Sequence, residues 1–289
     1  MKALVTGGAG LVGSNLARRL LKGGHSVRIL DHLSSGKERN IPVGARLIKG
    51  DILDKNSVKG AVEGIDVIFH LAAIASVPRS IEDPEKTFKV NVEGTKNILN
   101  AKNDEQRFVY TSSAAVYGNP RKLPISEGHA LSPISPYGES KVKAEEICKE
   151  YENIVIVRPF NIYGPGQDSL YDSAIPKFIA LASNNQPLIV TGDGNNTRDY
   201  VHVYDVCNAL IMLAEKEVQD IYNIGTGKAT KDIELAQLVK RINGEELEIK
   251  FIEARLGDIK HSYANILKIK SLGWTPVISL EQGLKGMMR

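Results

Sequence analysis

The chain opens on a short apolar strand, predicted at residues 2–6, that runs directly into a glycine-rich turn. Gly7, Gly10 and Gly13 recur at every third position, and the turn also satisfies the pattern G-x-G-x-x-G. A helix is predicted over residues 10–22, because apolar side chains recur there at helical spacing. Glycines between a strand and a helix permit an unusual turn and close packing of the helix on the strand. This beginning favours an α/β fold.

The rest of the first half alternates strands and helices. Further strands are predicted at 27–30, 46–49, 66–70, 108–111 and 154–157, with helices at 84–100 and 136–150. This rhythm predicts an α/β fold, a Rossmann-like doubly wound parallel sheet with a smaller C-terminal substrate-binding lobe. Loops become frequent after residue 159. We expect a Rossmann domain at 1–160, to which a segment near 200–225 returns, and a smaller domain at 161–289.

Composition narrows the class of protein. The chain has 289 residues, is 42% hydrophobic and carries a net charge of +3, without a dense block of Lys and Arg. We therefore expect no nucleic-acid partner and no membrane partner, since no apolar run approaches the ~20 residues of a membrane helix. Cys148 and Cys207 form no C-x-x-C pair and no metal spacing, so no metal site is predicted. A cytoplasmic location is expected.

The glycine turn indicates a site for the pyrophosphate of a dinucleotide. The N-terminus of a helix offers unpaired N–H groups and a positive dipole end to an anion. Asp31 ends the second predicted strand, where a carboxylate accepts the adenosine ribose hydroxyls and repels a 2′-phosphate. We therefore predict NAD rather than NADP. Asp51 is placed to bind the adenine amino group, although Asp also begins helices well. A plain tight turn and a helix-capping Asp31 are the alternatives.

Tyr137 and Lys141 are predicted to form an acid–base unit with Ser113. Residues four apart lie on one face of a helix, so the phenol and the ammonium face the same cleft. A free phenol is a poor base at neutral pH, and a nearby ammonium is expected to lower the pKa of Tyr137. Ser113 follows the fifth predicted strand and can hydrogen-bond the reacting oxygen. The alternative is a surface Tyr and Lys on an amphipathic helix.

Several further segments give the chain a family resemblance. They are TGGAG at 6–10, HLAA at 70–73, NVEGT at 91–95, TSSAAVYG at 111–118, RPFNIYG at 158–164 and RDYVHV at 198–203. With these motifs the chain resembles an extended short-chain dehydrogenase/reductase of the nucleotide-sugar epimerase/dehydratase group, and within it the UDP-glucose 4-epimerases. The resemblance runs from the glycine turn to near the C-terminus.

The resemblance implies roles for matching positions. The predicted cofactor contacts are Gly7, Gly10, Leu11, Val12, Gly13, Asp31, His32, Leu33, Ser34, Ser35, Gly36, Asp51, Ile52, Leu71, Ala72, Ala73, Ala75, Asn91, Ser112, Tyr137, Lys141 and Phe160. The predicted substrate contacts are Ser113, Tyr137, Asn161, Arg198, Arg255, Asp258 and Ser262. The two arginines would hold the diphosphate of a UDP-sugar, because a guanidinium suits phosphate geometry. A homodimer, paired through helices such as 84–100 and 136–150, is also implied.

The reaction implied is epimerisation at C4 of a UDP-hexose through a 4-keto sugar. Related 4,6-dehydratases carry an Asp-Glu pair directly after the serine, and the UDP-glucuronate decarboxylases also have an acid there. This chain has Ala114 and Ala115, whose methyl groups cannot exchange protons. A 4-reductase, a decarboxylase, a dehydratase and an inactive NAD-binding regulator are the alternatives.

Sugar size is expected to depend on one gate residue. By direct count from Arg255 the position that gates the sugar pocket in the epimerases is Ser262, followed by Tyr263. A small residue there implies tolerance of UDP-N-acetylhexosamines beside UDP-glucose and UDP-galactose. A shift of one residue would place Tyr263 in the gate instead.

Overall fold

The computed structural model describes residues 1–167, 173–244, 246–253 and 259–288. Its centre is a parallel sheet of seven strands in the order β11-β6-β5-β4-β1-β2-β3. The bounds are β1 Lys2–Thr6, β2 Ser26–Asp31, β3 Arg46–Lys49, β4 Val67–His70, β5 Arg107–Thr111, β6 Ile154–Pro159 and β11 Ile221–Ile224. Strands β2 and β3 follow on one side of β1, and β4, β5 and β6 follow on its other side. The strand order therefore reverses between β1 and β4, as in doubly wound folds. The predicted α/β, Rossmann-like sheet is confirmed.

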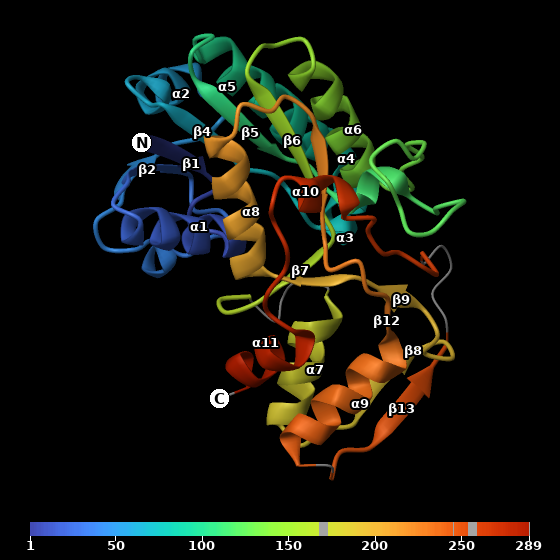
Figure 1. Ribbon diagram of the computed structural model, residues 1–289. Coiled ribbons are helices and arrows are strands. Elements are labelled where there is room, and N and C mark those ends of the chain that lie inside the picture. The colour runs from blue at the N-terminus through green and yellow to red at the C-terminus, as the bar shows by residue number, and fades with distance from the viewer. Residues whose placement is uncertain (168–172, 245, 254–258, 289) are drawn as a thin grey trace.

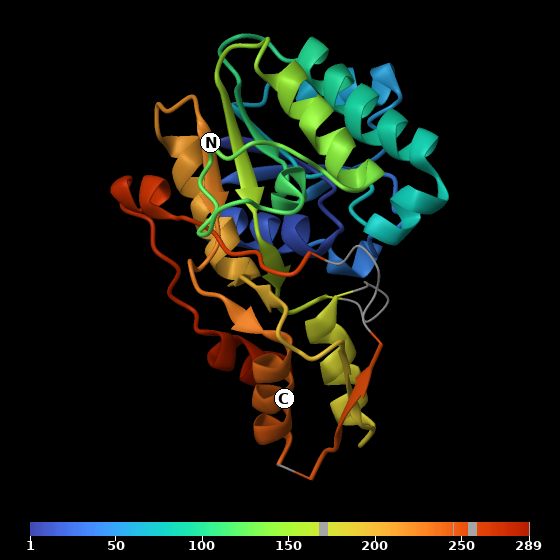
Figure 2. The same ribbon diagram turned by 90° about the vertical axis from the view of Figure 1, so that its right-hand side faces the viewer.

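Helices cover both faces of this sheet (Figures 1 and 2). Helices α1 (Leu11–Lys22) and α8 (Val203–Glu215) pack on one face, where Val5 belongs to a common core with them. Helices α2 (Lys55–Val62), α5 (Gly94–Ala101) and α6 (Pro136–Cys148) pack on the other face. The strands read as continuous apolar runs because their alternate residues are buried on opposite faces.

The helix predicted at 84–100 is interrupted by a wider turn. Helix α3 (Val77–Glu82) precedes α4 (Pro84–Phe88), and a π-helical segment, η2 (Lys89–Glu93), leads into α5. Such π-turns often occur at functional sites. Here the turn carries the buried Asn91, which contacts the loop after β4.

The smaller lobe lies below the carboxyl edge of the large sheet (Figure 1). Its core combines side chains of α7 (Ala174–Ser183), α9 (Asp232–Asn243) and α11 (Leu280–Met287) with those of β8 (Leu188–Thr191). Strand β8 pairs in parallel with β13 (Ile249–Ile252). Short pairs join β7 (Asn161–Tyr163) to β10 (Tyr200–His202), and β9 (Thr197–Arg198) to β12 (Thr230–Lys231).

The chain passes more than once between the two parts. Strand β11 pairs with β6 at the edge of the large sheet, and α10 (Leu267–Ser271) lies beside it. Two short 3-10 segments lie in the large part of the protein: η1 (Glu38–Asn40) in the loop after β2, and η3 (Ala114–Tyr117) in the loop after β5. The division into domains at residue 160 stays a prediction. No helix in the described part of the chain is long and apolar enough to cross a membrane.

Candidate active site

The glycine turn leaves no room for side chains at two positions. Gly7 has a φ of +69°, and a Cβ there would lie 2.9 Å from the backbone of Ala72. A Cβ on Gly13 would lie 2.3 Å from the carbonyl oxygen of Gly7. Helix α1 begins at Leu11, and its N-cap residue Gly10 has no side chain to cap it, so the first N–H groups of the helix are available to an anion. The turn therefore fits the pyrophosphate of a dinucleotide.

Asp31 fastens the glycine turn to the loop that follows β2. Its carboxylate accepts hydrogen bonds from the Ala9 N–H at 2.9 Å and the Leu33 N–H at 2.8 Å. Gly36 then packs directly on Ala9, since a Cβ on Gly36 would lie 2.6 Å from the Cβ of Ala9. One lone pair on each carboxylate oxygen remains for a ribose hydroxyl. The 31–36 segment thus lies beside the glycine turn, where sequence analysis placed cofactor contacts.

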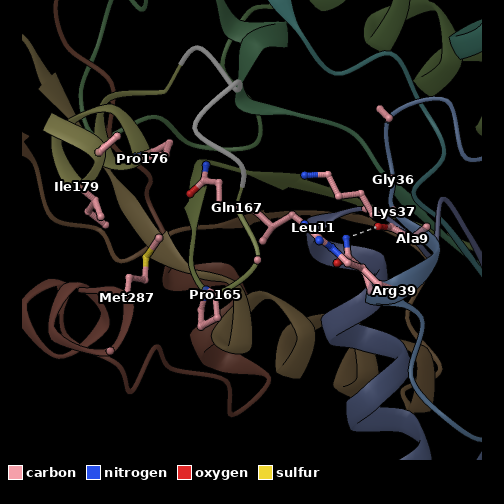
Figure 3. A pocket seen from close by; sticks show the side chains of 16 residues that line it. Ala9, Leu11, Gly36, Lys37, Arg39, Pro165, Gln167, Pro176, Ile179 and Met287 are labelled. Carbon is pink, nitrogen blue, oxygen red and sulfur yellow. Dashed lines mark hydrogen bonds between the residues drawn. The ribbon is translucent and has the colours of Figure 1, made fainter. Parts of the chain in front are cut away.

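A hollow of about 560 Å³ lies between the glycine turn and the smaller lobe (Figure 3). Leu11 and Lys37 line one side, and Pro165, Ile179 and Met287 line the other. The two sides are joined where the Asn15 side-chain amide donates to the Pro165 carbonyl at 3.2 Å. Residues of both lobes therefore line the space beside the pyrophosphate turn.

The loop after β4 forms a further wall of the cofactor site. The Thr6 hydroxyl accepts hydrogen bonds from the N–H groups of Leu71 at 3.2 Å and Ala72 at 3.1 Å. The Asn91 side chain makes two hydrogen bonds to the backbone of Ile74: it accepts from the Ile74 N–H at 2.8 Å and donates to the Ile74 carbonyl at 3.1 Å. The backbone of residues 71, 72 and 74 is therefore held in place by the side chains of Thr6 and Asn91. In the loop after β3, Asp51 accepts from the Leu53 N–H at 2.9 Å.

Helix α6 brings Tyr137 and Lys141 to the same buried site. Tyr137 is 9% exposed and Lys141 is 4% exposed. The Lys141 ammonium donates to the Thr111 carbonyl at the end of β5, at 2.8 Å. Asn91 donates to the Ser140 hydroxyl at 2.9 Å, and Ser140 donates to the Tyr137 carbonyl at 2.8 Å. The backbone that carries the phenol is therefore linked to the loop after β4.

The pKa values correct one expectation. Burial raises the pKa of the Tyr137 phenol above its ordinary value, and a hydrogen bond with Ser113 partly offsets this. Burial also lowers the pKa of Lys141 to about 8, although Cys148 and Glu145 act in the opposite direction. The prediction that the pKa of the phenol is lowered is wrong, because the effect of desolvation exceeds that of the hydrogen bond with Ser113. Tyr137 therefore carries its proton at neutral pH.

The two serines after β5 have different surroundings. Ser113 caps η3 by accepting from the Ala115 N–H at 3.1 Å, and it lies within hydrogen-bond reach of Tyr137. Ser112 donates instead to Glu145 Oε1 at 2.5 Å. Of the two serines after β5, only Ser113 is hydrogen-bonded with the phenol.

Beneath the site lies a buried ion pair that sequence analysis missed. Glu145 receives two hydrogen bonds from Arg158, at 2.9 Å to Oε1 and 2.5 Å to Oε2. Both side chains are at most 2% exposed. Arg158 also donates to Tyr117 Oη at 3.0 Å, and Tyr117 donates to Asn223 Oδ1 at 2.7 Å. A lone arginine in the apolar strand 154–159 was the available signal.

The predicted substrate contacts gather where the smaller lobe meets the sheet. The Asn161 side-chain amide donates to the Asp199 carbonyl at 3.3 Å, and Arg198 donates to the Thr197 carbonyl at 2.9 Å. The Ser262 N–H donates to the same Thr197 carbonyl at 3.1 Å. Phe160 is buried, with its ring centroid 6.4 Å from that of Tyr117. The predicted contacts Arg255 and Asp258 lie outside the described residues.

Comparisons with known proteins show which family the chain belongs to. Residues 3–225 match the model of the NAD dependent epimerase/dehydratase family. The chain belongs to this family, so the predicted family and the predicted NAD cofactor are confirmed. The chain is similar to UDP-N-acetylglucosamine 4-epimerase of Methanobrevibacter ruminantium, solved with UDP-N-acetylmuramic acid. The TM-score is 0.95 at 31% identity, covering 99% of this chain and 96% of that one.

Two further relatives are named for different reactions. UDP-glucose 4-epimerase of Thermotoga maritima, solved with UDP-glucose, gives a TM-score of 0.94 at 34% identity and covers 100% of this chain and 97% of that one. UDP-glucuronic acid decarboxylase 1 of Xenopus tropicalis is 34% identical over 296 residues, which are 98% of this chain and 70% of the relative. The family thus includes both epimerases and decarboxylases.

Proposed function

We propose that this protein epimerises a UDP-hexose at C4, interconverting UDP-glucose and UDP-galactose. The observation that carries the proposal is a buried phenol, Tyr137, hydrogen-bonded with Ser113 beside a cofactor cradle. Ala114 and Ala115 follow the serine directly, and neither methyl group exchanges a proton. The two positions directly after the serine therefore do not supply the acid–base groups that elimination needs.

The chain's own residues account for binding and proton movement. Bound NAD would supply the hydride chemistry at the sugar C4, as acceptor in the oxidation and donor in the reduction. With NAD bound, the positive charge of the nicotinamide would favour release of the Tyr137 proton to solvent. The phenolate Oη would then take the proton of the 4-hydroxyl and give it back after the sugar has turned over, while Ser113 Oγ would hold the reacting oxygen. Arg198 holds the diphosphate, so that the hexose swings while the nucleotide stays in place. Lys141 keeps a positive charge beside the site below about pH 8.

The nucleotide-sugar decarboxylases are the second candidate. The relative from Xenopus tropicalis supports this alternative, whereas Ala114 and Ala115 speak against it. Incubation of the purified protein with UDP-glucose, without added NAD, separates the two. We expect UDP-galactose to form with no net NADH, and a Tyr137→Phe variant to lose at least 100-fold in rate. Formation of UDP-xylose from UDP-glucuronate, without epimerisation of UDP-glucose, would refute the proposal.

We further propose that the site accepts N-acetylated sugars. Ser262, the predicted gate residue, is small and 9% exposed. The similarity to a UDP-N-acetylglucosamine 4-epimerase supports this assignment. Comparable rates on UDP-glucose and UDP-N-acetylglucosamine are expected, and a Ser262→Tyr variant should lose only the second activity. No turnover of the acetylated sugar by the wild type would contradict the gate assignment.

A homodimer is proposed as well. The surface of α4 and η2 is hollowed and lined by Pro84, Phe88 and Val92, while Ile81 of α3 is 62% exposed nearby in sequence. Apolar groups of this kind on adjacent helices favour pairing with a second copy. Sedimentation of the wild type as a dimer, and of a Phe88→Glu variant as a monomer, is the expected outcome.

A further inference from the structure

Asp199, which separates β9 from β10, is completely buried, with 0% exposure. Its carboxylate accepts four hydrogen bonds. Oδ1 accepts from the Thr226 N–H at 2.7 Å and the Thr226 hydroxyl at 2.6 Å, whereas Oδ2 accepts from the Gly227 N–H at 2.9 Å and the Ala264 N–H at 3.1 Å. A carboxylate has about four acceptor positions, so this one is saturated.

These four donors come from two segments that are anchored to the large sheet. Thr226 and Gly227 follow directly after β11, the strand at its edge. Ala264 is buried in the same core as Val5 of β1 and forms a parallel bridge with Ile125. Asp199 therefore ties the β9–β10 segment to the part of the protein that carries the cofactor site.

The same segment carries the predicted substrate contacts. The backbone carbonyl of Asp199 accepts from Asn161 through both its N–H at 2.9 Å and its side-chain amide at 3.3 Å. Arg198 is the preceding residue, and Ser262 bonds to the backbone of Thr197. Three side chains assigned to the sugar nucleotide thus depend on one short stretch of backbone.

Only a carboxylate satisfies this arrangement. An asparagine offers one acceptor oxygen, and its amino group would face the N–H donors of Gly227 and Ala264. The carboxylate also has no room to move, because a Cβ added to Gly225 would lie 2.6 Å from Asp199 Oδ2. Loss of the acceptor would leave buried N–H groups unpaired and displace the segment.

We propose that Asp199 is the positioning residue of the UDP-sugar site, because it holds Arg198 and Asn161 in a fixed position relative to the large sheet and to Tyr137 of α6, which packs on that sheet. The inference rests on the proposed function. Asp199 does not itself contact the substrate. It acts through the backbone, and its carboxylate gives the diphosphate-binding arginine a fixed place relative to the phenol.

The test is Asp199→Asn, measured by UDP binding in calorimetry and by NAD content after purification. We expect the UDP dissociation constant to rise about 10- to 100-fold, since buried N–H groups lose their acceptor. NAD content should stay at the wild-type level. Thr226→Val removes only the hydroxyl donor and should have a smaller effect. Asp193→Asn, at an exposed site in the same lobe, is the matched control and should leave both measurements unchanged.

The outcomes separate this inference from the proposed function. Absence of UDP binding by the wild type would refute the proposed function and, with it, the site that Asp199 is said to position. Wild-type UDP affinity in Asp199→Asn would overturn the inference alone, as would equal loss of UDP and NAD. If the variant does not fold, hydrogen exchange of the wild type decides. UDP should slow exchange at the Thr226, Gly227 and Ala264 amides, and unchanged exchange would overturn the inference.

Discussion

Acidification should unfold this protein partly through one buried histidine, His70, which is 1% exposed. Its Nδ1 lies 2.8 Å from the Thr6 hydroxyl, and its Nε2 lies 3.0 Å from the Thr95 hydroxyl. Thr6 already accepts two backbone N–H groups, so its own proton points to Nδ1. Thr95 donates to the Asn91 carbonyl at 2.6 Å and therefore accepts from Nε2. Only the neutral tautomer protonated at Nε2 satisfies every partner.

The magnitude follows from the pKa. Burial, and secondly the charge of Lys141, lower the pKa of His70 from 6.5 to about 3. The folded state binds the proton less tightly than the unfolded chain, so the stabilisation is fully present above pH 6.5. It is lost as the pH falls from 6.5 towards about 3. Between pH 6.5 and 4.5 the loss is about 2 kcal/mol in the free energy of unfolding.

Urea unfolding at pH 6.5 and pH 4.5 measures this loss in the free energy of unfolding. A His70→Gln variant lacks the ring whose protonation causes the loss. Carboxylates contribute to acid unfolding in both proteins, so only the difference between the two losses belongs to His70. We expect the wild type to lose about 2 kcal/mol more than the variant. Nitrogen-15 chemical shifts should show an unprotonated Nδ1 that does not titrate above pH 4.5. A ring pKa near 6.5, or equal losses in the two proteins, would refute the reasoning.

Three further predictions follow from the site. Gly13→Ala should abolish NAD binding in a calorimetric titration, because the added Cβ would lie 2.3 Å from the carbonyl oxygen of Gly7. Gly60→Ala is the control: a Cβ there has no atom within 4 Å, so this variant should bind NAD normally. The wild-type rate should fall above about pH 8 as Lys141 loses its proton, and Lys141→Arg should move this fall to higher pH; an unshifted profile would contradict the assignment. Glu145→Gln should lower the free energy of unfolding by about 3–5 kcal/mol, because it leaves the Arg158 charge buried without its partner. The double variant Glu145→Leu/Arg158→Met buries no charge, so urea unfolding should show most of this stability restored.

The local elements of the sheet could be predicted from the sequence. The strand at 2–6 and the strand at 46–49 have the predicted bounds, because short apolar runs ended by glycine or charge define buried parallel strands. The wide turn at η2 could not be predicted. The sequence there continues a helical pattern, and the turn is stabilised by the contacts of Asn91 with Ile74 and Ser140, which are distant in sequence.

The chemistry of the candidate site was predicted unevenly. Tyr137, Lys141 and Ser113 were predicted because helical spacing and strand ends place them without knowledge of the packing. The direction of the phenol pKa was not, since it depends on how deeply the side chain is buried. The hydrogen bond from the Ser112 hydroxyl to Glu145 was not predicted either, because Glu145 is 33 residues away in sequence; the cofactor contact of Ser112 stays a prediction.

By itself the sequence determined the parallel sheet, the glycine turn and the residue types of the candidate acid–base site, because these depend on spacing of a few residues along the chain. The tertiary structure alone decided which buried polar groups satisfy one another. The partners of His70, Arg158 and Asp199 come from segments far apart in sequence, and a buried donor or acceptor is stable only when such a partner is within hydrogen-bond distance. No local pattern encodes those distances.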